Sequence, residues 1–267
     1  MPRGKKLNIP AIKGAVMLVL GFFSAIGSAL SGIGAQVAAA PMINFLLGYS
    51  ADKSKGTALA FSLFAAIGAV CGIVLTGVHI QFGIAALVAI GATIGAIMAV
   101  KPSVDPRFLT VRRIGQSAGI LIGVYLISEG LHHRIGGPRS LDILVKNPVI
   151  GALVVGLITG ALSQLLNVAS GVFLVPSLIY LVGLRAPTAI AISLTVIALA
   201  SLLPTLSYSA QQAVDQKTGS WMAIGGAVGG LAGGSLLARL AVDSPIPFVV
   251  FGLIAMFLSA WTLYRMT

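Results

Sequence analysis

Two stretches of this chain, Gly14 to Ala51 and Asn147 to Leu184, contain no charged residue over 38 positions each. A single helix of that length would be about 57 Å long, whereas the apolar core of a bilayer is about 30 Å thick. Each stretch must therefore fold back inside a membrane. The centre of each is rich in Gly, Ser, Asn and Gln and precedes a proline, so it predicts a break in the helix. Non-helical backbone at that depth is tolerated only where protein or a wet cavity covers it, which makes the two breaks candidate functional sites.

Composition supports a membrane location. The chain is 57% hydrophobic and 9% charged, whereas soluble domains carry about 25% charged residues. The net charge of +11 comes from Lys and Arg residues clustered in short gaps between apolar runs, which is the pattern of topology signals rather than of nucleic-acid binding. We therefore expect an all-α polytopic protein integral to the membrane, with the lipid bilayer as a partner and no nucleic acid.

The chain reads as two repeats. After each charge-free stretch, charged residues delimit three further apolar segments, at about 56–78, 82–100 and 114–131 and again at about 187–209, 220–240 and 246–264. An ungapped offset of 135 aligns Gly21 with Gly156, Pro41 with Pro176 and Gly48 with Gly183. We predict an N-terminal repeat over 1–131, a connector over 132–146 and a C-terminal repeat over 147–267. Internal repeats of this kind are typical of transporters.

Charge predicts how the repeats are oriented. If each long stretch is a hairpin that returns to its starting side, each repeat crosses three more times and the second repeat is inverted. With the N-terminus inside, Lys and Arg then divide 12 inside against 5 outside, whereas parallel repeats divide them 9 against 8. The positive-inside rule favours inverted repeats with both termini in the cytoplasm. Whether the hairpins cross fully or are re-entrant stays open.

The two breaks predict an anion site. Glycine lets a ligand approach the main chain, and a helix that restarts after a break exposes unpaired N–H groups and the positive end of its dipole. Two such starts facing each other near the midplane would bind an anion. The alternative is that the small residues allow close helix packing and the polar ones bridge helices. The candidate substrate-binding residues in the breaks are Ser28, Ser31, Gly32, Gly34, Gln36, Ser163, Gln164, Asn167, Ser170 and Gly171. Pro41 and Pro176 have the structural role of starting the second helix of each hairpin.

Other chemistry has little support in the sequence. It contains no Ser/His/Asp set, no paired carboxylates and no metal-ligand cluster, and its aspartates are predicted in loops. We therefore expect no enzyme activity, no cofactor and no metal. The glycine-rich run at 225–234 predicts a close helix contact, either within the fold or in a homodimer through residues 220–240.

The glycine, serine and proline pattern of the breaks resembles the sulfite exporter TauE/SafE family, also called the TSUP transporters. The first copy keeps Gly21, Ser28, Gly32, Gly34, Pro41, Gly48 and Gly56-Thr57-Ala58-Leu59, and the second keeps Gly156, Gly160, Ser163, Gly171, Pro176, Gly183 and Ser193-Leu194. The resemblance adds Thr57 and Ser193 to the candidate site. It implies outward movement of sulfite or organosulfonates across the bacterial inner membrane. The family's glycine triplet is replaced by Gly34-Ala35-Gln36 and by Ala169-Ser170-Gly171, which leaves the substrate open.

The leading hypothesis is a secondary transporter that binds a small anion between the two hairpin turns and moves it by alternating access. An anion channel, a carrier of a different carboxylate or oxyanion, and a membrane assembly factor without a substrate are the alternatives.

Overall fold

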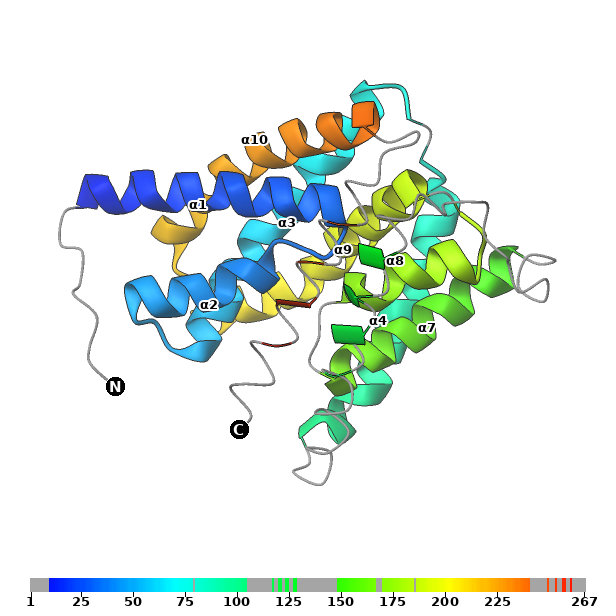
Figure 1. Cartoon of the computed structure of the whole chain (residues 1–267). Coiled ribbons are helices and arrows are strands. Elements are labelled where there is room, and N and C mark those ends of the chain that lie inside the picture. Colours follow the sequence, from blue (N-terminus) through cyan, green and yellow to red (C-terminus); the bar gives the residue numbers. More distant parts are fainter. Residues whose placement is uncertain are drawn as a thin grey trace.

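A computed structural model describes residues 10–78, 80–104, 117, 120–121, 123–124, 127–128, 148–166, 170–184, 186–240, 249, 253, 256–257 and 260. The elements of the described residues are helices (Figure 1). In the first half of the chain they are α1 (Pro10–Ser31), α2 (Gln36–Leu47), α3 (Ala51–Leu75) and α4 (Phe82–Val104). In the second half they are α7 (Pro148–Leu166), α8 (Ser170–Tyr180), α9 (Ala186–Ala210) and α10 (Gln216–Leu240).

The predicted all-helical class is confirmed for these residues. Helices α3, α4, α9 and α10 coincide with four of the predicted segments, and the predicted segments at 114–131 and 246–264 lie largely outside the described residues. By length and composition, four helices of the described part are able to cross a membrane: Lys13–Ser31, Lys53–Leu75, Phe82–Ala99 and Gln216–Leu240. The chain is therefore an integral membrane protein.

Each charge-free stretch contains a long helix followed by a short one: α1 and α2 in the first, α7 and α8 in the second. The first break is confined to residues 32–35, so the predicted turn residues Ser28 and Ser31 belong to the last turn of α1, and Gln36 begins α2. Helix α2 has 12 residues and would be about 18 Å long, too short to cross the core. Pro41 and Pro176 lie inside α2 and α8, not in their first turn as expected, because both helices begin earlier than predicted.

Matching capping residues set the helix ends in the two halves. Gly48 ends α2 with φ 67°, and Gly183 follows α8 with φ 78°, a left-handed backbone that favours glycine. The two glycines are the pair aligned by the offset of 135, and α3 and α9 then begin and end at positions related by the same offset. Helix α3 begins five residues earlier than predicted because the Ser50 side chain accepts a hydrogen bond from the Lys53 N–H (3.4 Å).

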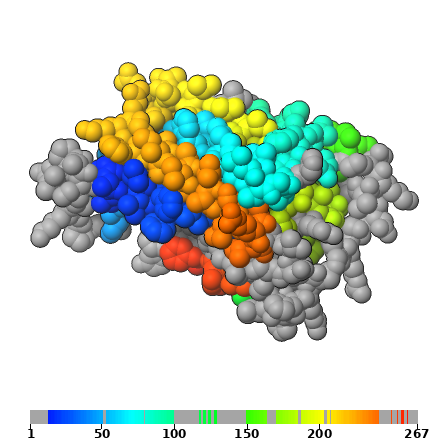
Figure 2. Space-filling model, turned by 90° about the horizontal axis from the view of Figure 1, so that it is seen from above, coloured from blue at the N-terminus to red at the C-terminus, as the bar shows by residue number. Residues whose placement is uncertain are grey.

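The most extensive helix contacts join the two halves of the chain. Helix α1 packs along α10, and α4 packs along α7, so the first helix of each half lies against the fourth described helix of the other. Figure 2 shows α10, in orange, between α1, in blue, and α3, in cyan. Helices α3 and α9 also pack against each other, at positions that the offset makes equivalent.

Glycines allow these helices to touch backbone to backbone. A Cβ added to Gly225 or Gly229 would overlap a carbonyl oxygen of α1, and one added to Gly230 or Gly234 would overlap a carbonyl oxygen of α3. The α4–α7 contact is built in the same way, with overlaps at Gly91, Gly95, Gly156 and Gly160. The predicted close contact of the glycine-rich run is thus made within the chain. The homodimer through 220–240 stays a prediction; it would use the other face of α10, which exposes Ile224 and Val228.

Gly230→Ala is expected to destabilise the protein. The added methyl group would overlap the Ala65 carbonyl oxygen, and overpacking of this kind costs about 1–3 kcal/mol. Gly219→Ala is the matched control in α10, because its Cβ would meet Thr57 at an ordinary 3.7 Å and alanine favours the helix. In detergent, thermal melts should show a lower transition for Gly230→Ala only; equal melting temperatures for both variants would contradict the packing account.

Candidate functional site

The break after α1 lies against the start of α8. A Cβ added to Gly171, the second residue of α8, would overlap the carbonyl oxygen of Gly32, and one added to Gly32 would lie 2.9 Å from Cγ2 of Val175. Residues about half the chain apart are therefore in backbone contact, and only glycine at position 171 permits it. The prediction that the two breaks face each other stays a prediction, because residues 167–169 lie outside the described residues.

The first break is shaped by two left-handed glycines. Gly32 has φ 72° and Gly34 has φ 99°, a conformation that other residues rarely adopt. The Gly32 N–H donates to the Ser28 carbonyl (2.7 Å), and the Ser31 hydroxyl donates to the Gly27 carbonyl (2.7 Å). These bonds finish α1 and satisfy its last carbonyl groups, so the chain can leave the helix although it is buried.

Helix α9 supplies a third wall. The hydroxyl of Ser193, which is fully buried, donates a 2.8 Å hydrogen bond to the Gly32 carbonyl. The polar groups at this junction thus come from α1, from the break and from α9, and the start of α8 closes it. We refer to Gly32, Gly171 and Ser193 as the turn junction.

Helix α2 starts at this junction without a side-chain cap. Ala35 occupies the N-cap position, is 2% exposed and has no group to accept from the first N–H groups of α2. A buried helix start of this kind favours negative charge. Beside it, the Ser62 hydroxyl of α3 donates to Oε1 of Gln36, and a Cβ on Gly34 would lie 2.9 Å from the same oxygen. Gln36 is thus held in place by α3 and by the break.

The structure gathers part of the predicted site. Ser28, Ser31, Gly32, Gly34 and Gln36 surround the first break, and Gly171 and Ser193 join them from the second half of the chain. Ser170 is the first residue of α8 and is half-buried, and Ser163 is half-buried near the end of α7. Asn167 and the side chain of Gln164 lie outside the described residues.

Thr57 is placed elsewhere by its contacts. Its buried hydroxyl accepts a 3.0 Å hydrogen bond from the Asp215 N–H, in the loop before α10. It therefore anchors that loop to α3, away from the first break.

Sequence reasoning missed Ser62 and a polar cluster around Asp215. Asp215 precedes α10 and accepts hydrogen bonds from the Thr218 N–H (3.2 Å), the Thr218 hydroxyl and the Tyr49 hydroxyl (2.8 Å). Lys53 Nζ lies 3.7 Å from its other oxygen and 4.6 Å from the centre of the Tyr49 ring. An Asp before an apolar run is a helix-cap signal that predicts Thr218 as a partner, but nothing in the sequence pairs it with Tyr49.

The charge state of this cluster follows from its contacts. Partial burial acts to raise the pKa of Asp215, but the hydrogen bonds from Thr218 and Tyr49 and the nearby Lys53 outweigh it and lower the pKa overall. Burial, together with the neighbouring Asp215 carboxylate, raises the pKa of the Tyr49 hydroxyl. At neutral pH the cluster is therefore a carboxylate held by a neutral phenol and an ammonium group.

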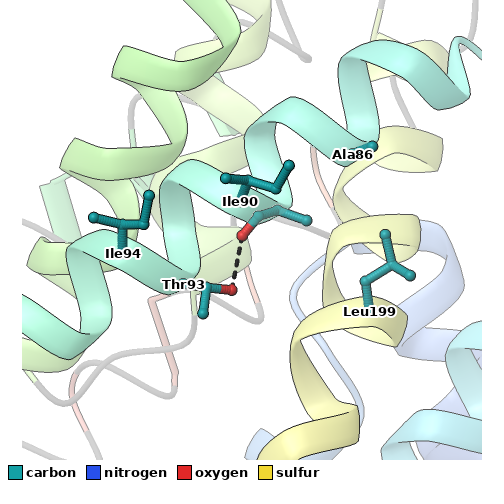
Figure 3. Close-up of a pocket in the computed structure, with 6 residues that line it drawn as sticks. Ala86, Ile90, Thr93, Ile94 and Leu199 are labelled. Atoms are coloured by element: carbon teal, nitrogen blue, oxygen red, sulfur yellow. Dashed lines mark hydrogen bonds between the residues drawn. The ribbon is translucent and has the colours of Figure 1, made fainter.

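An apolar groove between α4 and α9 is less suited to an anion. It has a volume of about 380 Å³ and is lined by Ala86, Ala89, Ile90, Thr93, Ile94 and Leu199. Figure 3 shows that its hydroxyl, from Thr93, is turned back to the Ala89 carbonyl, at 2.8 Å. The groove therefore offers apolar surface only. Within the described part of the chain, no group of three His, Cys, Asp or Glu side chains is placed to hold a metal ion.

Comparison with known proteins confirms the family resemblance. The family model of the sulfite exporter TauE/SafE matches residues 150–267. A curated protein of Xylella fastidiosa (strain Temecula1 / ATCC 700964), described as a probable membrane transporter protein, is 29% identical over 162 residues. That alignment covers 57% of this chain and 59% of the relative, so the chain matches about three fifths of the relative's length. No solved structure gives a significant match. The matched family is one of membrane transporters rather than of enzymes.

Ser193→Ala is expected to lower the stability of the turn junction. The substitution leaves the buried Gly32 carbonyl without the hydroxyl that donates to it, at a cost of about 1–3 kcal/mol. Thr195→Val is the control, because the Thr195 hydroxyl bonds to Ala191 in its own helix, at 2.9 Å, where the helix already satisfies that carbonyl. Thermal melts should separate the two variants, and equal losses would argue against a specific role of the Ser193 bond.

The Asp215 cluster is expected to make stability depend on acid pH. Because folding lowers the pKa of Asp215, its ionised form stabilises the fold above the unfolded value of about 4, and this contribution is lost as pH falls through the lower folded pKa. Asp215→Asn should have a lower free energy of unfolding than the parent at pH 7, and the difference between the two proteins should shrink below about pH 4. Tyr49→Phe, which keeps the carboxylate, should show a smaller gap. A pH-independent gap for Asp215→Asn would contradict the assignment.

Proposed function

We propose that this chain is a secondary membrane transporter that carries a small anion, sulfite or an organosulfonate, out of the cell by alternating access. The observation that carries the proposal is the contact between Gly171 and the Gly32 carbonyl, which joins the first helix break to the start of α8. The similarity of residues 150–267 to the sulfite exporter TauE/SafE family supports it. The location is the inner membrane of a bacterium, with both termini in the cytoplasm.

The proposal includes two inverted repeats, 1–131 and 147–267, each with a membrane hairpin and three further helices. The equivalent bounds of α3 and α9 at an offset of 135, and the reciprocal packing of α1 on α10 and of α7 on α4, support a repeat. Lys13, at the start of α1, and Leu47, at the end of α2, line one cavity. The chain thus returns to the side where α1 begins, which supports a re-entrant hairpin and, by the charge count, inversion.

The chemistry of the turn junction suits an oxyanion. Donor groups lie around the Gly32 carbonyl at the junction: the hydroxyls of Ser31 and Ser193 and the start of α2, which has no side-chain cap. A helix start and hydroxyl donors bind oxyanions without a full positive charge. In this structure the Ser31 hydroxyl donates to the Gly27 carbonyl and the Ser193 hydroxyl donates to the Gly32 carbonyl. We therefore propose that the anion replaces the Gly27 and Gly32 carbonyls as the acceptor when the two breaks separate. The closing of the breaks around the anion would be the alternating step.

The main alternative is an anion channel lined by the same helix starts. A carrier of a different small carboxylate or oxyanion is the second, because Gln36 occupies a position of the family's glycine triplet. The tight fit of Gly171 against Gly32 favours a carrier, since an open pore would need this contact to be absent.

Purified protein in vesicles is expected to move labelled sulfite or a small sulfonate with saturable rates and with counterflow. The rate saturates because each anion must occupy a binding site, and counterflow occurs because that site faces one side of the membrane at a time. A channel would instead give single-channel currents and no counterflow. Absence of flux with all tested sulfur oxyanions and carboxylates, in protein that remains folded, would refute the transport proposal.

Gln36→Leu and Asn167→Leu are expected to weaken anion binding about tenfold or more, because each loses one hydrogen bond to a charged group. Ser62→Ala is the control for Gln36, since it removes only the partner that holds the amide. If Gln36 binds the anion, Gln36→Leu should raise KM far more than Ser62→Ala does, at similar thermal stability. Equal KM values for the two variants would show that Gln36 serves packing alone.

A further inference from the structure

A polar cavity lies near the start of α1, at the opposite end of that helix from the turn junction. It has a volume of about 320 Å³ and is enclosed by the start of α1, the end of α2 and the start of α10. Lys13, one of its lining residues, and Ser31, in the last turn of α1, are separated by about 27 Å of helix. The cavity is therefore distinct from the turn junction, and it reaches the lower end of the roughly 300–1,000 Å³ typical of small-molecule sites.

Two lysines from different helices give the cavity positive charge. Lys13 comes from α1 and Lys217 from the first turn of α10. A cation in the first turn of a helix faces the positive end of the dipole, where an anion is favoured instead. An anion bound beside Lys217 would therefore be attracted both by the ammonium group and by the start of α10.

The carboxylate in the cavity does not cancel this charge. Asp215 accepts hydrogen bonds from Tyr49 and Thr218, and within the described residues its ion pair is with Lys53, at 3.7 Å. The cluster is already balanced by Lys53, which is not among the lining residues. The charges of Lys13 and Lys217 thus remain for a ligand.

One wall of the cavity is apolar. The Trp221 ring lies against the backbone of Gly14, where an added Cβ would be 3.0 Å from the indole, and 42% of the Trp221 surface remains exposed. Met17 and Leu47 line the same space. The cavity thus pairs two ammonium groups with aromatic and aliphatic surface.

We infer that this cavity binds an amphiphilic organic anion. Its carboxylate, sulfonate or phosphate group would contact Lys13 and Lys217, and its apolar part would lie against Trp221 and Met17. Two sources have this chemistry: a soluble small organic anion, and the headgroup of an anionic lipid, since Trp and Lys side chains gather where a membrane meets water. The inference does not depend on the transport proposal, because it concerns binding at a separate place.

Trp221 provides a native reporter for the test. The sequence has two tryptophans, so Trp261→Phe leaves Trp221 as the sole emitter. This variant, in zwitterionic nanodiscs built with a tryptophan-free scaffold protein, is titrated with 1-pentanesulfonate, and a saturable change in Trp221 emission is expected. Sodium sulfate and 1-pentanol, which carry the charge or the chain alone, should give no saturable change at the same concentrations.

Lysine variants in the same background assign the site. Lys13→Gln combined with Lys217→Gln should weaken sulfonate binding at least about tenfold, through the loss of two charge-assisted contacts. Lys55→Gln is the matched control, because Lys55 is exposed on α3 and does not line the cavity. Unchanged affinity in the double variant, or equal weakening by Lys55→Gln, would overturn the inference whether or not the protein transports anions.

Nanodiscs that contain phosphatidylglycerol separate the two sources. If sulfonate saturates in zwitterionic lipid, the soluble anion is the ligand. If emission changes only when phosphatidylglycerol is present, and the lysine double variant abolishes that change, the lipid headgroup is the ligand. If neither probe gives a lysine-dependent change in Trp221 emission, the cavity binds no amphiphilic anion.

Discussion

Backbone contact between helices of opposite halves is the constraint on which the rest of the structure depends. In lipid, burial of apolar side chains gives helices little reason to associate, so close approach, dispersion and hydrogen bonds must hold them together. The α1–α10 and α4–α7 pairs achieve this with glycines that leave no room for a Cβ. Because each pair joins one half to the other, neither half buries its first helix alone.

The turn junction follows from this exchange of helices. Packing against α10 fixes the direction of α1, and packing against α4 fixes α7; the end of α1 and the start of α8 then lie at the same place. The contact of Gly171 with Gly32 and the bond from Ser193 to Gly32 complete the junction. A site of this kind needs both halves, since the carbonyl comes from one and the hydroxyl from the other.

The sequence predicted the parts of this fold that depend on length and charge. A run of 38 residues without charge is too long for one crossing, and the structure has two helices in each such run. The sequence predicts a turn from Ser28 to Gln36, but α1 continues to Ser31 and α2 begins at Gln36. Ser31 instead bonds to the Gly27 carbonyl within α1, as buried serines often do.

Hydrogen bonds between side chains of different helices could not be predicted from the sequence. Ser62 is an isolated hydroxyl in an apolar run, and its bond to Gln36 depends on the register of α3 against α2. Thr57 was assigned to the site by resemblance, yet its hydroxyl bonds to the loop before α10. Local patterns fix where a helix begins and ends, but the rotation of one helix against another depends on packing along its whole length.

Positions related by the offset of 135 differ in chemistry. The residues that the offset of 135 makes equivalent to Tyr49 and Asp215 are Leu184 and Ile80, which pack in the hydrophobic core. One junction between α2, α3 and α10 is thus held by a carboxylate, a phenol and an ammonium group, and its counterpart by aliphatic side chains. Salt and acid weaken charge-based contacts and leave aliphatic ones nearly unchanged. Salt and acid therefore act on the Asp215 cluster more than on the contacts of Leu184 and Ile80, although the offset of 135 makes these positions equivalent.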